Sequence, residues 1–318
     1  MDDLRPSVPP LELSLLLLLG ILWGIPYALT KIALQTIPPI TLVAARVSMA
    51  AIVLWLVVLL LGRKLPERRD FTSRLFIQAM LACVIPYTLI AFGQRSVGSA
   101  LAAILNSTTP LFVCVISVLW TRHEPMTFGR VSGVTVGLAG VILIAGSSAL
   151  LALGAETRGQ AAIVLATFAS AASVIHGRRF SDIAPEITAA GTLTCAAIML
   201  VPLCFVAETP LSTTPSLSSL AALLANALVA TALGFVVYFR LIRTIGSIST
   251  ASVGYLKPAV GVLIGCALMD EALTPTMMMG LAAILVGVAA INEKISVARL
   301  RKWVRRAGPV PGTPAINL

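Results

Sequence analysis

Charged residues are scarce in this chain of 318 amino acids, where they make up only 11% of the sequence. An ordinary soluble domain carries about 25%, so the composition excludes one. The 58% of apolar residues and the mean hydropathy of +0.98 require lipid as the surrounding solvent. The net charge of +10 comes from short connecting segments, and such a distribution does not indicate a nucleic-acid partner.

Residues that carry chemistry are also few. The chain has two histidines, and its five cysteines all fall in apolar stretches, where they are interpreted as packing residues. A membrane-embedded enzyme, the rival class, would need a nucleophile and base, paired acids or a metal cluster at depth. A receptor would usually carry a soluble sensing domain. We therefore expect no catalytic residue, no metal and no cofactor.

Ten apolar segments are long enough to cross a bilayer, which takes about 20 residues per helix. The chain is thus predicted to be an all-α integral membrane protein with ten transmembrane helices. Numbered one to ten, the expected spans are 13–34, 38–61, 75–94, 98–120, 128–148, 159–177, 185–207, 219–240, 247–268 and 274–292.

The basic residues indicate the orientation. Most lie in connections that share one side, whereas only Lys31, Arg95 and Arg158 fall on the other side. By the positive-inside rule, both termini are predicted to be cytoplasmic in a bacterial-type inner membrane. The basic cytoplasmic tail, residues 293–318, suits contact with anionic membrane lipids.

An internal repeat divides the chain. GSALAAILNSTTP at 98–110 is echoed by GSISTASVGYLKP at 246–258, an offset of 148 residues, and EPMT at 124–127 is echoed by EALT at 271–274. The predicted repeats are 13–148 and 159–292. Five spans per repeat is an odd number, so the repeats must be inverted relative to each other. Inverted repeats are typical of secondary transporters with a substrate site near the membrane midplane.

A set of residues at characteristic positions accompanies the repeat. They are Trp23, Gly24, Lys31, Arg46, Pro110 with Glu124, Pro258 with Glu271, and Gly133 and Gly140 with their counterparts. In these features the chain resembles the drug/metabolite transporter (DMT) superfamily, specifically permeases with two EamA domains. The resemblance implies transport of small metabolites, amino acids or drugs, and a cavity lined by spans one, three, four, six, eight and nine. Two departures from the pattern are that Ala171 stands where Trp23 would align in the second repeat, and that span seven has no counterpart to Arg46.

Two cations lie inside predicted spans, and buried charges in a membrane are functional candidates by default. Lys257 is ten residues into span nine, about 15 Å deep at 1.5 Å per residue. We predict that it binds a carboxylate or phosphate of the substrate; the alternative is a lysine neutralised by burial or bonded to carbonyls freed near Pro258. Arg46 is the second predicted binding cation, although it can snorkel toward the surface. Arg46, Lys31 and Arg95 either line a common basic vestibule or lie on unrelated faces of the protein.

Six further residues complete the predicted substrate site. Aromatic rings away from the membrane interfaces suit a cavity lining, but ordinary packing explains them as well. Hydrogen bonds between helices are the alternative for the polar members. These six residues are Trp23, Tyr27, Tyr87, Asn106, Thr109 and Tyr255.

Two motifs are interpreted as structural. Glu124 and Glu271 precede Thr127 and Thr274, which are expected to be N-caps of the following helices. The glycines at 129, 133 and 137 form a small-residue face, which indicates close packing or the seam of a homodimer.

The predicted function is a secondary transporter that moves a small metabolite, amino acid or organic anion by alternating access. Its expected partners are an anionic or zwitterionic small molecule and membrane lipids. Multidrug efflux of lipophilic compounds is the alternative, but lipophilic cations call for a buried carboxylate. No Asp or Glu lies inside a predicted span, so facilitated diffusion or exchange is a simpler interpretation than a carboxylate proton relay.

Overall fold

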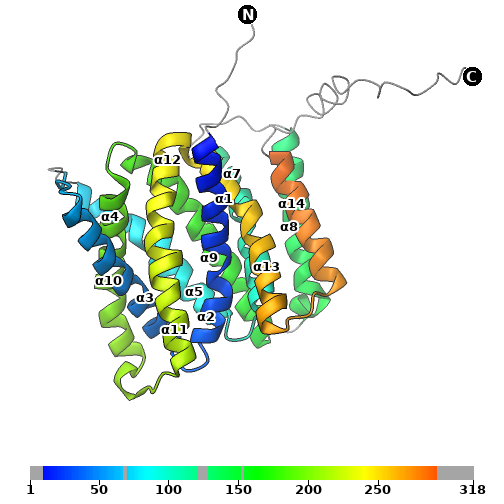
Figure 1. Ribbon diagram of the computed structural model, residues 1–318. Helices are drawn as coiled ribbons and strands as arrows, with labels where there is room; N and C mark the ends of the chain where they lie inside the picture. Colours follow the sequence, from blue (N-terminus) through cyan, green and yellow to red (C-terminus); the bar gives the residue numbers. More distant parts are fainter. Residues whose placement is uncertain (1–9, 67–69, 120–127, 152–153, 292–318) are drawn as a thin grey trace, which may run out of the picture.

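The computed structural model describes residues 10–66, 70–119, 128–151 and 154–291. Seven helical segments are long and apolar enough to cross a membrane, and three shorter apolar helices fall on expected spans five, nine and ten. The prediction of an all-α protein with ten spans is confirmed. The helices run side by side through one slab, and α1 (Pro10–Gly24) begins at the edge of the slab where α14 (Pro275–Ile291) ends (Figure 1).

Each repeat contributes five spans. In the first repeat these are α1 with α2 (Pro26–Ala33), α3 (Pro39–Leu60), α4 (Phe71–Ala79) with η1 (Met80–Val84) and α5 (Ile85–Gly93), α6 (Ser99–Asn106) with α7 (Thr109–Leu119), and α8 (Phe128–Leu151). In the second repeat, spans six and seven are α9 (Ala155–Gly177) with η2 (Arg178–Phe180) and α10 (Pro185–Ala207), which the short turn η3 (Pro210–Ser212) follows. Span eight is α11 (Leu217–Ala225) with η4 (Asn226–Leu233) and α12 (Gly234–Ala251) as far as its kink at Gly246. The last turn of α12, η5 (Ser252–Tyr255) and α13 (Leu256–Met269) form span nine, and α14 is span ten.

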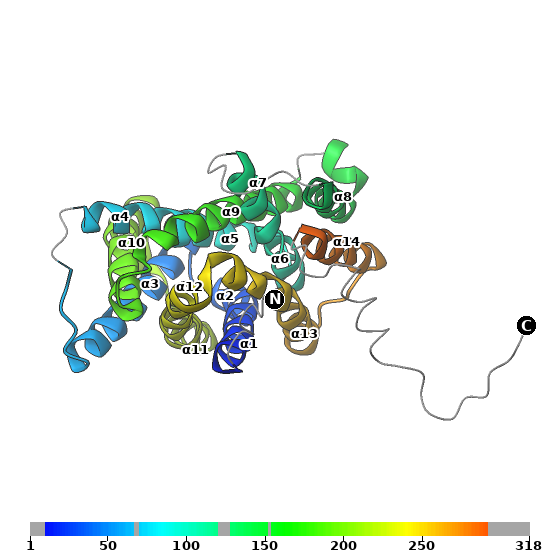
Figure 2. The same cartoon turned by 90° about the horizontal axis from the view of Figure 1, so that it is seen from above.

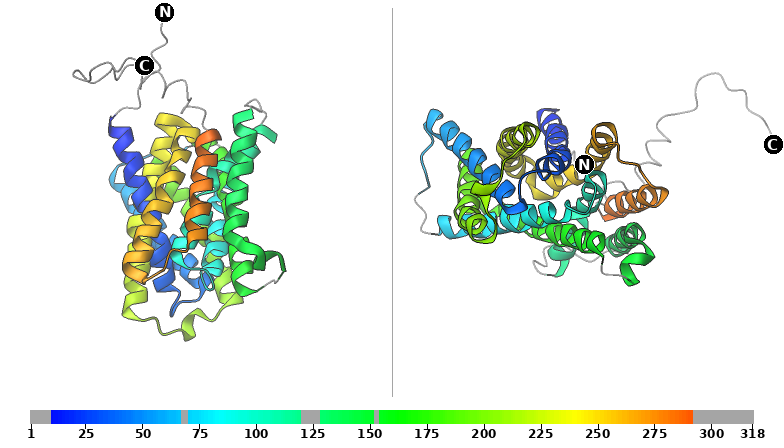
Figure 3. Two further views of the ribbon diagram at one scale, coloured as in Figure 1. Left: turned by 90° about the vertical axis from the view of Figure 1, so that its right-hand side faces the viewer. Right: turned by 90° about the horizontal axis from the view of Figure 1, so that it is seen from below.

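The spans pack in pairs that join the two repeats. Span two packs on seven (α3 on α10), four on nine (α6 on α13) and five on ten (α8 on α14), while three packs on six (α5 on α9) and one on eight (α1 on α12). Exchanging the repeats returns the same set of pairs, as expected for inverted repeats. The α8–α14 pair lies at one end of the bundle and α10 lies toward the other (Figures 2 and 3).

Five spans are interrupted partway along their length. In span one, Pro26 removes a single helical hydrogen bond after Ile25, whose backbone remains helical. Span four is interrupted at Ser107 and Thr108, and span nine at the 3-10 turn η5. Spans three and eight carry the π-helical turns η1 and η4, which occupy corresponding positions under the offset of 148 residues. Interruptions of a helix at membrane depth are tolerated where other groups form hydrogen bonds with the backbone N–H and C=O groups that are left unpaired.

Hydroxyl side chains provide those partners in span four. Ser107, Thr108 and Thr109 follow α6, and each hydroxyl donates to the carbonyl oxygen three residues earlier, at 2.5, 2.7 and 2.8 Å. The Ile104 and Leu105 carbonyl oxygens also accept from the backbone N–H of Ser107 and Thr108. The Asn106 carbonyl oxygen faces Pro110 four residues later, which has no N–H, so the Thr109 hydroxyl supplies the donor that the proline lacks. Local sequence thus explains where the helix breaks.

A carboxylate of the second repeat caps the N-terminus of a helix in the first repeat. Glu271 accepts hydrogen bonds from the backbone N–H of Ser99 (2.6 Å) and Ala100 (2.7 Å) at the start of α6. An acidic group there satisfies unpaired donors and complements the helix dipole. The structural role predicted for Glu271 is thus to accept hydrogen bonds from the start of a helix that is distant in the sequence.

The next helix has its own cap. The Thr274 hydroxyl accepts from the backbone N–H of Met277 at 3.3 Å, as expected of an N-cap. Glu124 and Thr127 lie outside the described residues, as does the tail at 293–318.

The glycine face of span five is used within the chain. A Cβ at Gly287 would lie 2.4 Å from the Gly133 carbonyl oxygen, and one at Gly137 would lie 2.4 Å from Leu111 Cδ1. These positions therefore permit the close approach of α14 and α7 to α8, which supports the packing interpretation of the motif.

We expect Glu271→Ala to lower the stability of the fold, because two backbone donors at the start of α6 lose their acceptor. The expected loss is about 1–2 kcal/mol, seen as a lower midpoint of thermal unfolding in detergent. Glu156→Ala is the control, since its carboxylate accepts one 3.3 Å bond from Gln160. An equal effect of both substitutions would contradict the capping role.

Candidate functional site

A cavity of about 110 Å³ lies between the repeats. Seven of the eight predicted site residues line it, and the side chain of Tyr255 lies outside the described residues. The lining comprises Trp23, Pro26, Tyr27, Thr30, Leu42, Val43, Arg46, Ala82, Tyr87, Ile90, Ala91, Gln94, Asn106, Thr109, Ser170, Ser173, Val174, Phe235, Tyr238 and Lys257.

The lining residues come from the six expected spans and from span two. Span two was not expected to line the cavity as an element, although Arg46 was predicted as a site residue. Among the lining residues that the structure describes, none belongs to spans five, seven or ten. The interrupted spans one, three, four, eight and nine all reach the cavity, so the breaks and the cavity coincide.

Arg46 is buried and held by two contacts. Its side chain is 7% exposed, its Nε donates to Thr231 Oγ1 at 2.6 Å, and its guanidinium carbon lies 4.1 Å from the centre of the Tyr87 ring. Thr231 belongs to η4 and donates in turn to the Asn226 carbonyl oxygen at 2.8 Å. The two π-helical spans therefore fix the position of the guanidinium, one through a hydroxyl and the other through an aromatic face.

Lys257 lines the cavity from the start of α13. Its Nζ is 4.9 Å from the centre of the Trp23 ring, and the side chain is partly exposed. Throughout the described part of the chain, no acidic side chain forms an ion pair with Lys257 or Arg46. An aromatic face attracts a cation but does not neutralise it. The cavity therefore has a positive electrostatic character.

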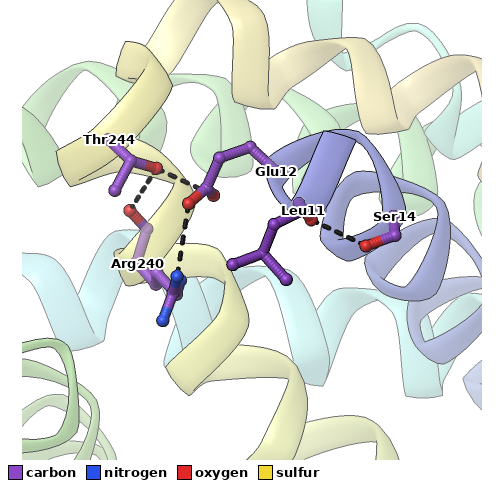
Figure 4. A network of polar contacts seen from close by, with 5 residues as sticks. All are labelled: Leu11, Glu12, Ser14, Arg240 and Thr244. Atoms are coloured by element: carbon purple, nitrogen blue, oxygen red, sulfur yellow. Dashed lines mark hydrogen bonds and ion pairs between the residues drawn. The ribbon is translucent and has the colours of Figure 1, made fainter. Parts of the chain in front are cut away.

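Acidic groups are engaged near the ends of the helices. Glu12 at the start of α1 bonds to Arg240 (3.3 Å) and Thr244 (3.0 Å) on α12, as Figure 4 shows. Glu208 accepts from the backbone N–H of Ile40 and Thr41 at the start of α3. Neither carboxylate lines the cavity.

Lys31 and Arg95 do not share the cavity with Arg46. Lys31 Nζ donates to the carbonyl oxygens of Gln94 (2.7 Å) and Val97 (3.0 Å) beyond the end of α5, and Arg95 is exposed. Gln94 donates from its side-chain amide to the Tyr27 carbonyl oxygen at 2.8 Å. These contacts favour the interpretation of separate positions over a shared basic vestibule.

Asn106 and Thr109 line the cavity but also bond within the protein. Asn106 Nδ2 donates to Thr167 Oγ1 on α9 at 3.5 Å, which is a weak hydrogen bond, and the Thr109 hydroxyl donates to the Asn106 carbonyl oxygen at 2.8 Å. Asn106 therefore forms a hydrogen bond between helices, which was the alternative to a role in substrate binding.

Two aromatic lining residues of α12, Phe235 and Tyr238, are not among the predicted site residues. Both rings contact Trp23, with centroid distances of 6.3 and 5.0 Å. The repeat offset of 148 residues relates Phe235 to Tyr87. Applying that offset to each predicted site residue would have found Phe235.

The comparisons with known proteins agree with this architecture. Inverted repeats around a central cavity are typical of membrane transporters. The chain belongs to the EamA-like transporter family, whose model matches residues 10–146 and 157–293. The resemblance seen in the sequence is thereby confirmed.

Individual relatives are similar over most of their length. The uncharacterized inner membrane transporter YedA of Escherichia coli (strain K12) is 27% identical over 92% of both chains. Protein PecM of Dickeya dadantii is 24% identical over 89% of this chain and 92% of its own. A solved crystal structure has a TM-score of 0.64 at 19% identity, covering 87% of this chain and 97% of that one, which shows the fold alone.

Thr231→Val should destabilise the protein because it leaves Arg46 Nε without its acceptor. A hydrogen bond to a charged group contributes roughly 1.5–3 kcal/mol, so the midpoint of thermal unfolding should fall clearly. Thr88→Val is a matched control, since the buried Thr88 hydroxyl has no partner among the described residues. Equal midpoints for the two variants would show that Thr231 does not hold Arg46.

Proposed function

We propose that the protein is a secondary transporter that moves a small anionic or zwitterionic metabolite, amino acid or organic anion across the inner membrane. The observation that carries this proposal is the pair of cations, Arg46 and Lys257, in a cavity with no acidic lining residue among those described. A cation at that depth gains most from an anionic ligand, because the surrounding protein and lipid screen charge weakly. Lipophilic cations would be repelled by the same charges.

The proposed orientation places both termini in the cytoplasm. The basic residues concentrate on the side where α1 begins and α14 ends, which supports this orientation by the positive-inside rule. Lys31 and Gln94 then lie on the periplasmic side of the cavity, while η2 lies on the cytoplasmic side.

Polar links suggest which helices move together. Spans one and eight are joined near both ends, by Glu12 with Arg240 and by Asn226 Nδ2 with Thr30 Oγ1 at 3.1 Å. Spans three and six are likewise joined by Gln78 Oε1 with His176 Nδ1 at 2.9 Å and by Ser96 Oγ with the Ala155 carbonyl at 2.9 Å. Links at both ends favour two units that move as rigid bodies.

Different contacts close the cavity between these units on the two sides. On the proposed periplasmic side, Lys31 of span one binds carbonyls beyond span three. On the cytoplasmic side, Phe180 follows span six and packs edge-on against Phe239 of span eight, with ring centres 6.4 Å apart. Alternating access would break the polar contacts in one state and the aromatic contacts in the other.

Lys257→Ala should abolish transport of the anionic substrate, because losing one partner of a buried charge pair costs roughly 3–5 kcal/mol, about 100-fold or more in affinity. Lys257→Arg should retain part of the activity, since a planar fork replaces a point charge. The measurement is uptake into proteoliposomes from a panel of anionic metabolites, amino acids and organic cations. Unchanged transport by Lys257→Ala would show that the lysine is structural.

Weakening each closing contact should open the cavity to one side only. The reporter is Ser170→Cys, a cavity-lining position, in a variant whose five native cysteines are replaced. Lys31→Met should speed its labelling by an impermeant thiol reagent from the periplasmic side several-fold, and Phe239→Ala from the cytoplasmic side. Labelling that changes equally on both sides, or on the reverse sides, would contradict the assignment of these contacts.

A further inference from the structure

The two cations of the cavity lie on separate walls. Arg46 belongs to α3 and rests against Tyr87 of α5, whereas Lys257 belongs to α13 and rests against Trp23 of α1. Seen from above, α2 lies between α3 and α13 (Figure 2). The two cations are therefore held by different helices and different aromatic rings, and each presents its own binding point to the cavity.

Each cation keeps hydrogen-bonding capacity for a ligand. Arg46 uses Nε for Thr231, and its two terminal nitrogens have no hydrogen-bond partner in the described part of the chain. Those nitrogens form part of the planar edge that binds carboxylates. Lys257 Nζ has the Trp23 ring beside it, and a ring face accepts none of the three ammonium hydrogens in a conventional hydrogen bond.

The described residues supply no acidic partner for either charge. Glu208 and Glu271 bind helix starts, and Glu12 binds Arg240 and Thr244. A cation–aromatic contact contributes about 0.5–2 kcal/mol, whereas removing an ion from water costs several kcal/mol. Compensating charge must therefore come from the contents of the cavity.

We propose that the substrate carries two acidic groups, one bound by Arg46 and the other by Lys257. This inference rests on the proposed function and narrows it. A monoanion would leave one cation without a counter-charge. A zwitterion would place its ammonium group in a cavity that already holds two cations, so it would bind more weakly than a dianion of the same size.

The size and the lining of the cavity restrict the rest of the molecule. One water needs about 10–15 Å³ on this measure, so about 110 Å³ suits a compact molecule. Aromatic and apolar side chains, including Tyr27, Val43 and Phe235, account for much of the lining. The chemical class that fits is a short dicarboxylate with an apolar carbon chain between its acidic groups.

The test uses pairs of probes that differ by one charge at nearly constant shape. Malonate, succinate, glutarate and adipate are compared with their half-amides at pH 7.5, by calorimetric titration of the purified full-length protein. We expect at least one diacid to bind tenfold or more tightly than its own half-amide, the ratio that corresponds to about 1.4 kcal/mol. This comparison needs only the wild-type chain, so it stands even if a variant fails to fold.

Variants then assign the two charges. Lys257→Gln should bring the affinity of the preferred diacid down to that of its half-amide, while the half-amide binds as it does to the wild type. Arg95→Gln is the matched control, because Arg95 is exposed and does not line the cavity, and it should preserve the tenfold preference. Loss of the preference in Arg95→Gln would show a general effect of surface charge and overturn the assignment to Lys257.

The possible failures separate the two proposals. Half-amides that bind as tightly as every diacid, or no binding by any diacid while other monoanions bind, would overturn the two-group inference and leave the anion transporter intact. Binding of organic cations with no binding of any acid would overturn both. Tight binding of zwitterionic amino acids but not of diacids would retain the proposed function and reject the dianion.

Discussion

The structure depends on the need to satisfy every backbone polar group without water. In lipid, an interrupted helix is stable only where side chains or cavity water meet the freed N–H and C=O groups. Thr231 shows how this requirement shapes the site. Its hydroxyl donates to the Asn226 carbonyl within a π-helical turn and accepts from Arg46 Nε. One hydroxyl therefore both satisfies a carbonyl of the π-helical turn and positions a buried cation, so a change in the backbone at η4 would move the guanidinium in the cavity.

The placement of acidic groups follows from the same scarcity of water. Carboxylates such as Glu208 and Glu271 lie near the ends of spans, where helix N-termini supply several N–H donors and a favourable dipole. They join the repeats at the membrane surfaces and leave the interior without a described acid. Arg46 and Lys257 are stabilised by aromatic faces, which hold their positions without cancelling their charge. Both charges therefore remain available to the ligand that we propose.

Much of this arrangement could be predicted from the sequence. Apolar length located the ten spans, and the 148-residue offset identified the repeats, because both signals are local or periodic. Depth alone singled out Lys257 and Arg46, which both line the cavity. The partners of these residues were not predictable in the same way. That Glu271 caps α6, or that Thr231 meets Arg46, depends on the register between helices 172 and 185 residues apart, which sequence periodicity does not specify.

The two repeats have the same fold, but the residues at corresponding positions of the cavity differ. This difference accounts for the positive charge of the cavity. Under the repeat offset, Lys257 corresponds to Thr109, Trp23 to Ala171 and Arg46 to Thr194. Thr109 bonds to its own helix, Ala171 is buried, and Thr194 accepts from Trp55 Nε1 at 2.8 Å. Each cation therefore occurs in only one of the repeats, and both aromatic partners, Tyr87 and Trp23, belong to the first repeat. In the proposed transport cycle, the symmetry of the helices would let the cavity face either side of the membrane, whereas the asymmetry of these residues would give a bound molecule one preferred orientation. A substrate with two acidic groups would experience a guanidinium at one end and an ammonium at the other in every state of the transport cycle.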